Sequence, residues 1–438
     1  MADSATSVTS PGSLLGWRAR RELPYVRRGS GVFLEAEDGV NYLDGSSGAL
    51  AAALGHGRGD MAAVLSNQAM SVAFAHRTQL RNRATEELAD LLAQRAPGDL
   101  SSSMFVSSGS DANELALALS IRYWHGEGHP ERQHVLARGR SYHGATLGAL
   151  SLTGLAERRA VMEPLLFEVP RLPSPGPDLD AEGESRLLAE LETALCSVQP
   201  HHVAAVMIEA VSGTSGGAIV PPRSYTDRIQ RFCRETGALL IVDEVMSGFG
   251  RTGRLFAFEH LGLEPDVVTF GKGVSGGYCP LGGVIVTTAV AERLDELGGV
   301  GLGHTYMNTP LPSAVGLAAC RIILAEQFLS SVHARGEELR TQLRLLRERH
   351  SERISSVRGV GLMNAVEIVA RPDDRQSSAG LLLGAMRDAG LLLYPATSHV
   401  PGSSTTHVVM VAPPLVITAE EVNELVRRFD RGLTRYFE

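Results

Sequence analysis

Residues 267–277 read VVTFGKGVSGG, where a short apolar run ends among glycines around Lys272. The run suits a strand that is buried on both faces. Lys272 is the only lysine, so the other 41 − 1 = 40 basic residues are arginines. Arginine stays protonated, whereas a lysine with a lowered pKa can attack a carbonyl carbon and form a Schiff base. Lys272 is therefore the first candidate for chemistry, and the alternative is a chance survivor of a strong arginine bias.

Similar apolar runs lie before and after this one along the chain, with helical patterns between them. They cover residues 103–106, 135–137, 203–208, 238–242 and 283–286. Unbroken apolar runs separated by helices predict an α/β fold with a mainly parallel sheet covered on both faces. In such sheets the ligand binds beyond the carboxyl ends of the strands. We therefore expect the polar residues that end these runs to meet in one place: residues 107–111, Tyr142, His143, Glu209, Asp243 and Lys272.

At 438 residues the chain is long enough for two domains. We expect a disordered tail at 1–13, a segment at 14–60 that packs with the small domain, a large cofactor-binding domain at 61–312 and a small α+β domain at 313–438. Residues 31–44 alternate around an Asp-Gly turn and predict a β-hairpin. Other expected elements are a helical pattern at 61–94 with a break near 75–81, helices at 112–124, 313–329, 331–350, 378–389 and 419–436, and a small unit that includes 361–368, 391–394 and 408–411.

Composition narrows the classes of partner. The formal net charge of −8 and the absence of a dense basic run argue against nucleic acid or an anionic membrane as the main partner. No apolar run approaches the roughly 20 residues that cross a bilayer, and residues 1–13 lack the pattern of a signal peptide. The four cysteines are widely spaced and predict reduced residues of a cytoplasmic protein, with no metal site.

The residues at the strand ends meet the needs of one cofactor, pyridoxal phosphate. Residues 107–111 read SSGSD between a strand and a helix and offer N–H groups to an anion, although a simple helix cap is the alternative. Asp243 supplies a carboxylate for the cofactor's ring nitrogen, and Tyr142 supplies an aromatic ring, although an ion pair and ordinary packing are their alternatives. The amine of Lys272 suits the cofactor's aldehyde.

These residues carry a resemblance to a known family. The motifs are FVSSGSDANE at 105–114, SYHG at 141–144, LIVDEV at 240–245 with GFGRTG at 248–253, FGKG at 270–273 with GGYCPLGG at 276–283, and Thr305-Tyr306 before Pro310. In order and spacing they resemble the class III (ω-type) aminotransferases from about residue 34 to residue 415. The resemblance implies pyridoxal-phosphate fold type I, with a mainly parallel seven-stranded sheet and a homodimer that shares its active sites.

The resemblance also implies roles at the cofactor ring. Lys272 would form the Schiff base and then act as the base in the proton shift. Asp243 would pair with the ring nitrogen. Tyr142 would stack on one face of the ring, and Val245 would pack on the other.

Further roles concern the cofactor phosphate and the edge of the site. Gly109 and Ser110 would hold the phosphate, and Thr305 would reach the phosphate of the neighbouring subunit. Glu209 matches an acidic family residue, although Ala210 follows where a proline is usual. His143 is expected near the phosphate or the ring edge.

The sequence departs from the family where a substrate carboxylate is usually bound. Met410 and Tyr394 stand where members of two family branches carry an arginine, and Thr214 stands near the usual place of a glutamate that pairs with one of them. Met246 replaces a glutamine that commonly touches the ring hydroxyl, and Ala49 replaces a glutamine of the related decarboxylases. Either another arginine substitutes, with Arg77, Arg81, Arg158 and Arg159 as candidates, or the substrate is not held by its carboxylate.

Three functions remain open from the sequence. The leading hypothesis is an aminotransferase that moves an amino group from an amine or amino acid to a keto acid, ketone or aldehyde. The missing arginines leave room for a racemase, epimerase or aminomutase with the same cofactor. A catalytically silent binding protein of the same fold is the third.

Overall fold

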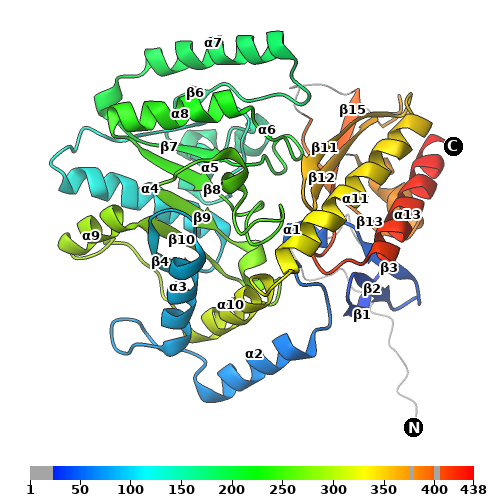
Figure 1. The fold of residues 1–438 in the computed structure, drawn as a ribbon, viewed down its shortest axis with the longest axis horizontal. Coiled ribbons are helices and arrows are strands. Elements are labelled where there is room, and N and C mark those ends of the chain that lie inside the picture. The colour runs from blue at the N-terminus through cyan, green and yellow to red at the C-terminus, as the bar shows by residue number, and fades with distance from the viewer. Residues whose placement is uncertain (1–22, 375–378, 399–404) are drawn as a thin grey trace.

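The computed structural model describes residues 23–374, 379–398 and 405–438. The expected disordered tail at 1–13 lies outside these residues. Three sheets organise the described chain, one of seven strands and two of four. In Figure 1 the seven-stranded sheet and its helices form one body, and the two smaller sheets lie beside it with α11 and α13.

The seven-stranded sheet confirms the expected α/β fold. Its strands lie in the order β4 (Leu100–Val106), β10 (Gly282–Thr287), β9 (Val267–Phe270), β8 (Leu239–Asp243), β7 (Val203–Glu209), β5 (His134–Arg138) and β6 (Arg171–Leu172). Only β10 runs antiparallel to its neighbours β4 and β9, and the remaining pairs are parallel. The carboxyl ends of β5, β7, β8 and β9 therefore meet at one edge.

Both faces of this sheet are buried, because side chains along a strand alternate between them. Leu240 and Val242 of β8 join one core cluster, whereas Leu239 and Ile241 join another. The first cluster includes residues of α3 (Arg83–Arg95), α7 (Ala181–Ser197), α8 (Arg223–Thr236) and α10 (Pro310–Ile323); the second includes residues of α4 (Gly109–Gly126), α5 (Leu147–Leu152) and α9 (Thr288–Glu296). This double coverage explains the unbroken apolar runs of the sequence.

One four-stranded sheet lies near the C-terminus. Its order is β11 (Ile354–Val360), β12 (Met363–Val369), β15 (Thr406–Val411) and β14 (Tyr394–Ala396), and helices α11 (Phe328–Arg349), α12 (Gly380–Asp388) and α13 (Ala419–Phe437) accompany it. The sequence did not predict β11, because its residues ISSVRGV mix polar and apolar side chains without clear alternation.

The other four-stranded sheet joins distant parts of the chain. It contains β1 (Val26–Ser30), β2 (Phe33–Ala36), β3 (Asn41–Asp44) and β13 (Leu391–Leu392). β2 and β3 form the expected hairpin, and β3 pairs in parallel with β13. The N-terminal hairpin thus packs with the C-terminal part, although the domain boundaries at 60 and 312 stay a prediction.

Of two helical regions expected from the sequence, one matches the structure and the other is wrong at one end. The pattern at 61–94 forms α2 (Gly59–Ser71) and α3, with the expected break between them. The expected helix at 313–329 is wrong at its end, because α10 stops at Ile323 and α11 starts at Phe328 with a bend of 69° between them. Gln327 has a φ of 67°, in the left-handed region that ends a right-handed helix. Among the described residues no single helix is long and apolar enough to cross a membrane.

The remaining helices are short. They are α1 (Ser47–Leu50), α6 (Ala156–Arg159) and the 3₁₀ turns Glu163–Leu165, Pro200–His202, Ala257–Leu261 and Lys272–Ser275. The last of these turns follows β9 directly and places Lys272 at the carboxyl edge of the large sheet.

Candidate active site

A cavity of about 560 Å³ opens at the carboxyl edge of the large sheet. Eight of the nine predicted site residues line it: Gly109, Ser110, Tyr142, His143, Glu209, Asp243, Val245 and Lys272. They come from the ends of β4, β5, β7, β8 and β9, so the rule about strand ends correctly placed five separate segments together. Thr305 is exposed in the loop before α10 and does not line the cavity of its own chain.

Lys272 lies at the floor of this cavity with unusual backbone geometry. Its φ of 44° falls in the left-handed region, which costs energy for a residue with a Cβ atom. Burial lowers the pKa of Lys272 to about 8, although the charges of Asp243 and Glu209 act in the opposite direction. At pH 7 roughly a tenth of the amine is then neutral, far more than for an ordinary lysine, and the neutral amine is the form that attacks a carbonyl.

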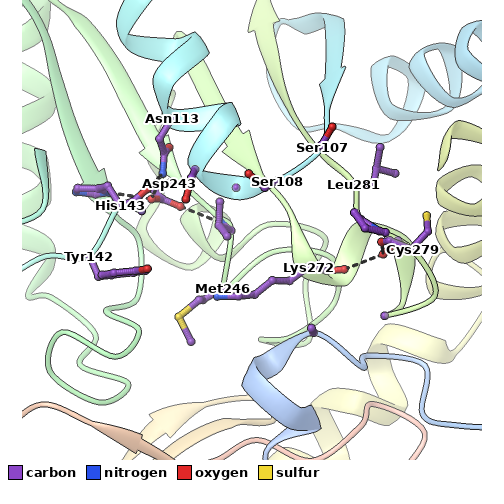
Figure 2. A pocket seen from close by; sticks show the side chains of 18 of the residues that line it. Ser107, Ser108, Asn113, Tyr142, His143, Asp243, Met246, Lys272, Cys279 and Leu281 are labelled. Carbon is purple, nitrogen blue, oxygen red and sulfur yellow. Dashed lines mark hydrogen bonds and ion pairs between the residues drawn. The ribbon is translucent and has the colours of Figure 1, made fainter. Parts of the chain in front are cut away.

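Asp243 is held by donors on both carboxylate oxygens. Its Oδ2 accepts hydrogen bonds from His143 Nδ1 at 2.8 Å and from Asn113 Nδ2 at 2.8 Å. Its Oδ1 accepts one from the backbone N–H of Val245 at 2.9 Å. Figure 2 shows His143 and Asn113 joined to Asp243 by dashed lines. These donors occupy both carboxylate oxygens and fix their direction.

The structure therefore places His143 against Asp243. The backbone N–H of His143 also donates to Thr153 Oγ1 at 2.9 Å, and Asn113 Nδ2 donates to the carbonyl oxygen of His143 at 2.6 Å. Sequence reasoning missed Asn113. A polar residue on the buried face of α4, next to Ala112 and Leu115, was the signal that could have found it.

The N-terminus of α4 forms one wall of the cavity. Ser108 caps the helix, because its Oγ accepts from the N–H of Asp111 at 3.1 Å, and Ser110 Oγ accepts from the N–H of Ala145 at 3.1 Å. The expected cap and the expected anion site are therefore compatible features of one turn. Free N–H groups at this end of an 18-residue helix suit a phosphate.

Gly109 faces Val245 at very close range. A Cβ atom at Gly109 would lie 2.5 Å from Val245 Cγ1, closer than packed atoms tolerate. The missing side chain therefore lets the N-terminus of α4 pack directly against Val245, and both residues line the cavity.

We expect Gly109→Ala to weaken binding of pyridoxal phosphate by about tenfold, because overpacking of this kind costs about 1–3 kcal/mol. Equilibrium titration of the apoprotein with the cofactor measures the effect. Gly59→Ala is the matched control, since Gly59 also begins a helix and a Cβ there would meet no atom within 4 Å. Val245→Ala in the Gly109→Ala background should restore affinity, and a failure to do so would contradict the steric explanation.

Glu209 makes contacts that stabilise the neighbouring loop. Its Oε1 accepts from the N–H of Gly213 at 3.0 Å, its Oε2 accepts from Ser215 Oγ at 3.0 Å, and Arg138 Nη2 lies 3.5 Å from Oε2. Both members of the Arg138–Glu209 pair are buried. Glu209 thus fixes the loop after β7 at the edge of the cavity.

Two of the departures from the family pattern are direct neighbours in the structure. Met410 of β15 pairs with Tyr394 of β14, and Met410 is fully buried. Met246 lines the cavity. Among the described residues that line the cavity there is no arginine, so Lys272 is its only lysine or arginine.

Comparison with known proteins decides the family. The model of the family described as "Aminotransferase class-III" matches residues 18–433. The chain belongs to the class III aminotransferases. These enzymes depend on pyridoxal phosphate, and the cavity fits that group through Lys272, Asp243 and the helix N-terminus at Gly109.

Individual relatives agree along almost the whole chain. The uncharacterized aminotransferase YodT of Bacillus subtilis is 34% identical over 418 residues, which cover 93% of this chain and 94% of that protein. The putrescine–pyruvate aminotransferase of Pseudomonas aeruginosa is 29% identical over 92% of this chain and 88% of its own. A thermostable (S)-enantioselective ω-transaminase from Thermomicrobium roseum is 34% identical with a TM-score of 0.88, covering 100% of this chain and 97% of that one.

These similarities confirm the expected fold type I, the cofactor and the reaction type. This class III aminotransferase is an enzyme that acts on small molecules, and neither the racemase nor the silent-protein hypothesis is favoured.

Proposed function

We propose that this class III aminotransferase moves an amino group from a primary amine or amino acid to a keto acid, ketone or aldehyde, with Lys272 as its catalytic amine. The observation that carries the proposal is the position of the chain's only lysine. It lies in the same cavity as Asp243, and its pKa is lowered to about 8. When bound, pyridoxal phosphate supplies an electron sink that stabilises a carbanion next to the substrate nitrogen.

The proposed roles of the other residues follow from their positions. Asp243 would pair with the ring nitrogen, and His143 and Asn113 fix the direction of its carboxylate. Gly109 and Ser110 bind the phosphate through the N-terminus of α4.

Further roles concern the two faces of the ring. Tyr142 would cover one face of the ring and Val245 the other, and both residues line the cavity. Lys272 would act as the base that takes the proton from the substrate carbon next to the nitrogen, because its lowered pKa of about 8 makes the neutral amine accessible.

The test of this proposal is a balanced assay of both products. The holoenzyme should convert an amine donor to its carbonyl compound while an added 2-oxo acid or aldehyde becomes an amine in equal amount. Exchange of solvent deuterium into an amino acid without any carbonyl product would instead indicate racemisation and would overturn the proposal.

The substrate range is also part of the proposal. A putrescine–pyruvate aminotransferase and an ω-transaminase are among the similar proteins, and we propose that amines without a carboxylate are donors here. The cavity supports this proposal because no arginine is among its described lining residues.

We further propose that two copies of the chain form a homodimer. The α2–α3 connection and the loop before α10 expose large apolar side chains: Met70, Val72, Phe74, Leu80, Leu302 and Tyr306. The rings of Phe74 and Tyr306 are 5.8 Å apart, and Arg77 Nη1 donates to the carbonyl oxygen of His304, so the two segments form one surface. Thr305 lies on this surface, from which it would reach the cavity of a partner subunit.

Cytoplasmic location stays a proposal on the sequence grounds given above.

Replacing both Phe74 and Tyr306 by Glu should raise the dimer dissociation constant by about 100-fold or more, since central aromatic residues dominate most interfaces. Sedimentation velocity over a concentration series measures this. Leu345→Glu on α11 is the control, because Leu345 is also an exposed apolar residue but lies elsewhere. If the double variant stays as dimeric as the control, this surface is not the dimer interface.

A further inference from the structure

Arg140 has no carboxylate within ion-pair distance among the described residues, and it lies in a place partly closed to water. Among the described residues, five arginines have a buried side-chain nitrogen with no hydrogen bond: Arg138, Arg140, Arg159, Arg228 and Arg293. Four of them lie within ion-pair distance of a glutamate. Arg140 has no carboxylate partner in the described part of the chain, and its Nε is the unbonded atom.

The surroundings of Arg140 are unfavourable for an isolated cation. Its Nη2 donates to the carbonyl oxygen of Ser398, and this is the one hydrogen bond that its side chain makes with the described residues. Burial lowers the pKa of Arg140, and Glu157 opposes this only from beyond ion-pair distance. Removing a guanidinium from water without a carboxylate partner costs free energy. Binding of an anion to Arg140 would offset that cost.

Arg140 does not line the active-site cavity itself but is linked to two residues that do. It precedes Tyr142, a lining residue, by two positions. Its partner Ser398 follows Thr397, whose N–H donates to the carbonyl oxygen of Thr214 at 2.7 Å. Thr214 follows Gly213, against which the side chain of the lining residue Met246 packs.

We propose that Arg140 receives the carboxylate of acidic substrates at the mouth of the cavity, in place of the arginines that Met410 and Tyr394 replace. This assignment rests on the proposed aminotransferase function and identifies the group that would select acids over neutral substrates. A planar guanidinium with free donors can bind a carboxylate through two parallel hydrogen bonds.

The other arginines considered from the sequence fit this role less well. Arg81 pairs with Glu86, Arg159 pairs with Glu163, and Arg77 donates to the carbonyl oxygen of His304. Arg158 lies near the loop that contains Arg140 and Tyr142. Gly154, four positions before Arg158, donates its N–H to the carbonyl oxygen of Ser141 in that loop at 2.9 Å. The side chain of Arg158 is exposed, however, so water already compensates its charge.

The experiment compares acids with neutral partners of equal length in the holoenzyme. The acceptor pairs are pyruvate with propanal and 5-oxopentanoate with pentanal, so that near and distant carboxylates are both sampled. The variants are Arg140→Gln and Arg140→Lys, with Arg158→Gln and Arg159→Gln as controls that remove the same charge nearby. Binding of pentanoate and of pentanamide is measured in parallel by calorimetry, and unfolding midpoints check the fold of each variant.

We expect Arg140→Gln to lower kcat/KM for at least one acid acceptor by about tenfold or more, with less than a twofold change for its aldehyde partner. Arg140→Lys should fall between the wild type and Arg140→Gln, because the charge remains but the two-point contact is lost. Pentanoate binding should weaken in Arg140→Gln while pentanamide binding stays constant.

Three results would overturn the assignment. The first is an equal loss of kcat/KM for acids and aldehydes in Arg140→Gln, which indicates a structural role. The second is no loss for either kind of acceptor in Arg140→Gln. The third is a loss of acid selectivity in Arg158→Gln alone. If the wild type transaminates no amine at all, the proposed function fails, whereas the comparison of pentanoate with pentanamide still tests Arg140.

Discussion

Lys272→Arg is expected to lower kcat by at least about 10⁴-fold, since arginine keeps a positive charge but cannot act as an amine nucleophile or as a base near neutral pH. Steady-state turnover of an amine with a 2-oxo acid measures the loss. The substitution keeps a long cationic side chain at the cavity floor, so an effect of this size separates chemistry from charge.

The composition of the chain makes this prediction unusually direct to check. Because Lys272 is the only lysine, the variant has no side-chain amine left. Borohydride reduction of the wild-type holoenzyme, followed by denaturation and peptide mapping, should leave the cofactor on the peptide that contains residue 272. The reduced variant should retain none, and turnover near the wild-type rate in Lys272→Arg would refute the assigned role.

Asp243→Asn is expected to lower kcat by about 10²-fold to 10⁴-fold, because an amide cannot keep the ring nitrogen of the cofactor protonated. Asparagine has nearly the same shape and can still accept from His143 or Asn113, so the fold should survive. Steady-state turnover measures the loss, and Asp243→Glu should retain more activity than Asp243→Asn because it keeps the charge.

Asp243→Asn should also move the pH dependence of pyridoxal phosphate capture by the apoprotein to lower pH. The charge of Asp243 raises the pKa of Lys272, whereas burial lowers it, and the result is about 8. The amine reacts when neutral, so capture of pyridoxal phosphate by the apoprotein should speed up as pH rises and level off above this pKa. Removing the Asp243 charge lowers the pKa of Lys272 further, and the midpoint of the profile should move to lower pH.

Glu209→Gln is the matched control for this electrostatic effect. Glu209 also raises the pKa of Lys272, so its loss should move the midpoint in the same direction. Its carboxylate braces the loop after β7, and we assign it no contact with the ring nitrogen. Turnover should therefore fall far less than in Asp243→Asn, and an equal fall would contradict the separate roles.

The sequence by itself determined the large sheet and the position of the cavity. Strands buried on both faces need unbroken apolar residues, and parallel strands place their carboxyl ends at one edge. Reading where each run ends was therefore enough to bring together Lys272, Asp243, Glu209 and Tyr142. The single lysine pointed to the chemistry, because composition does not depend on the fold.

Only the tertiary structure decided which side chains meet within that edge. His143 was expected near the phosphate or ring edge, and the structure shows that its Nδ1 bonds to Asp243, as does Asn113, to which the sequence assigned no role. The end of α10 at Ile323 and the strand β11 were likewise not readable from local pattern. Arg158 was among the arginines considered from the sequence, whereas nothing in the sequence distinguished Arg140 from the rest of the 40 arginines. The difference between them is whether a carboxylate or water faces the guanidinium, and that depends on residues far away in the sequence, so local sequence cannot reveal it.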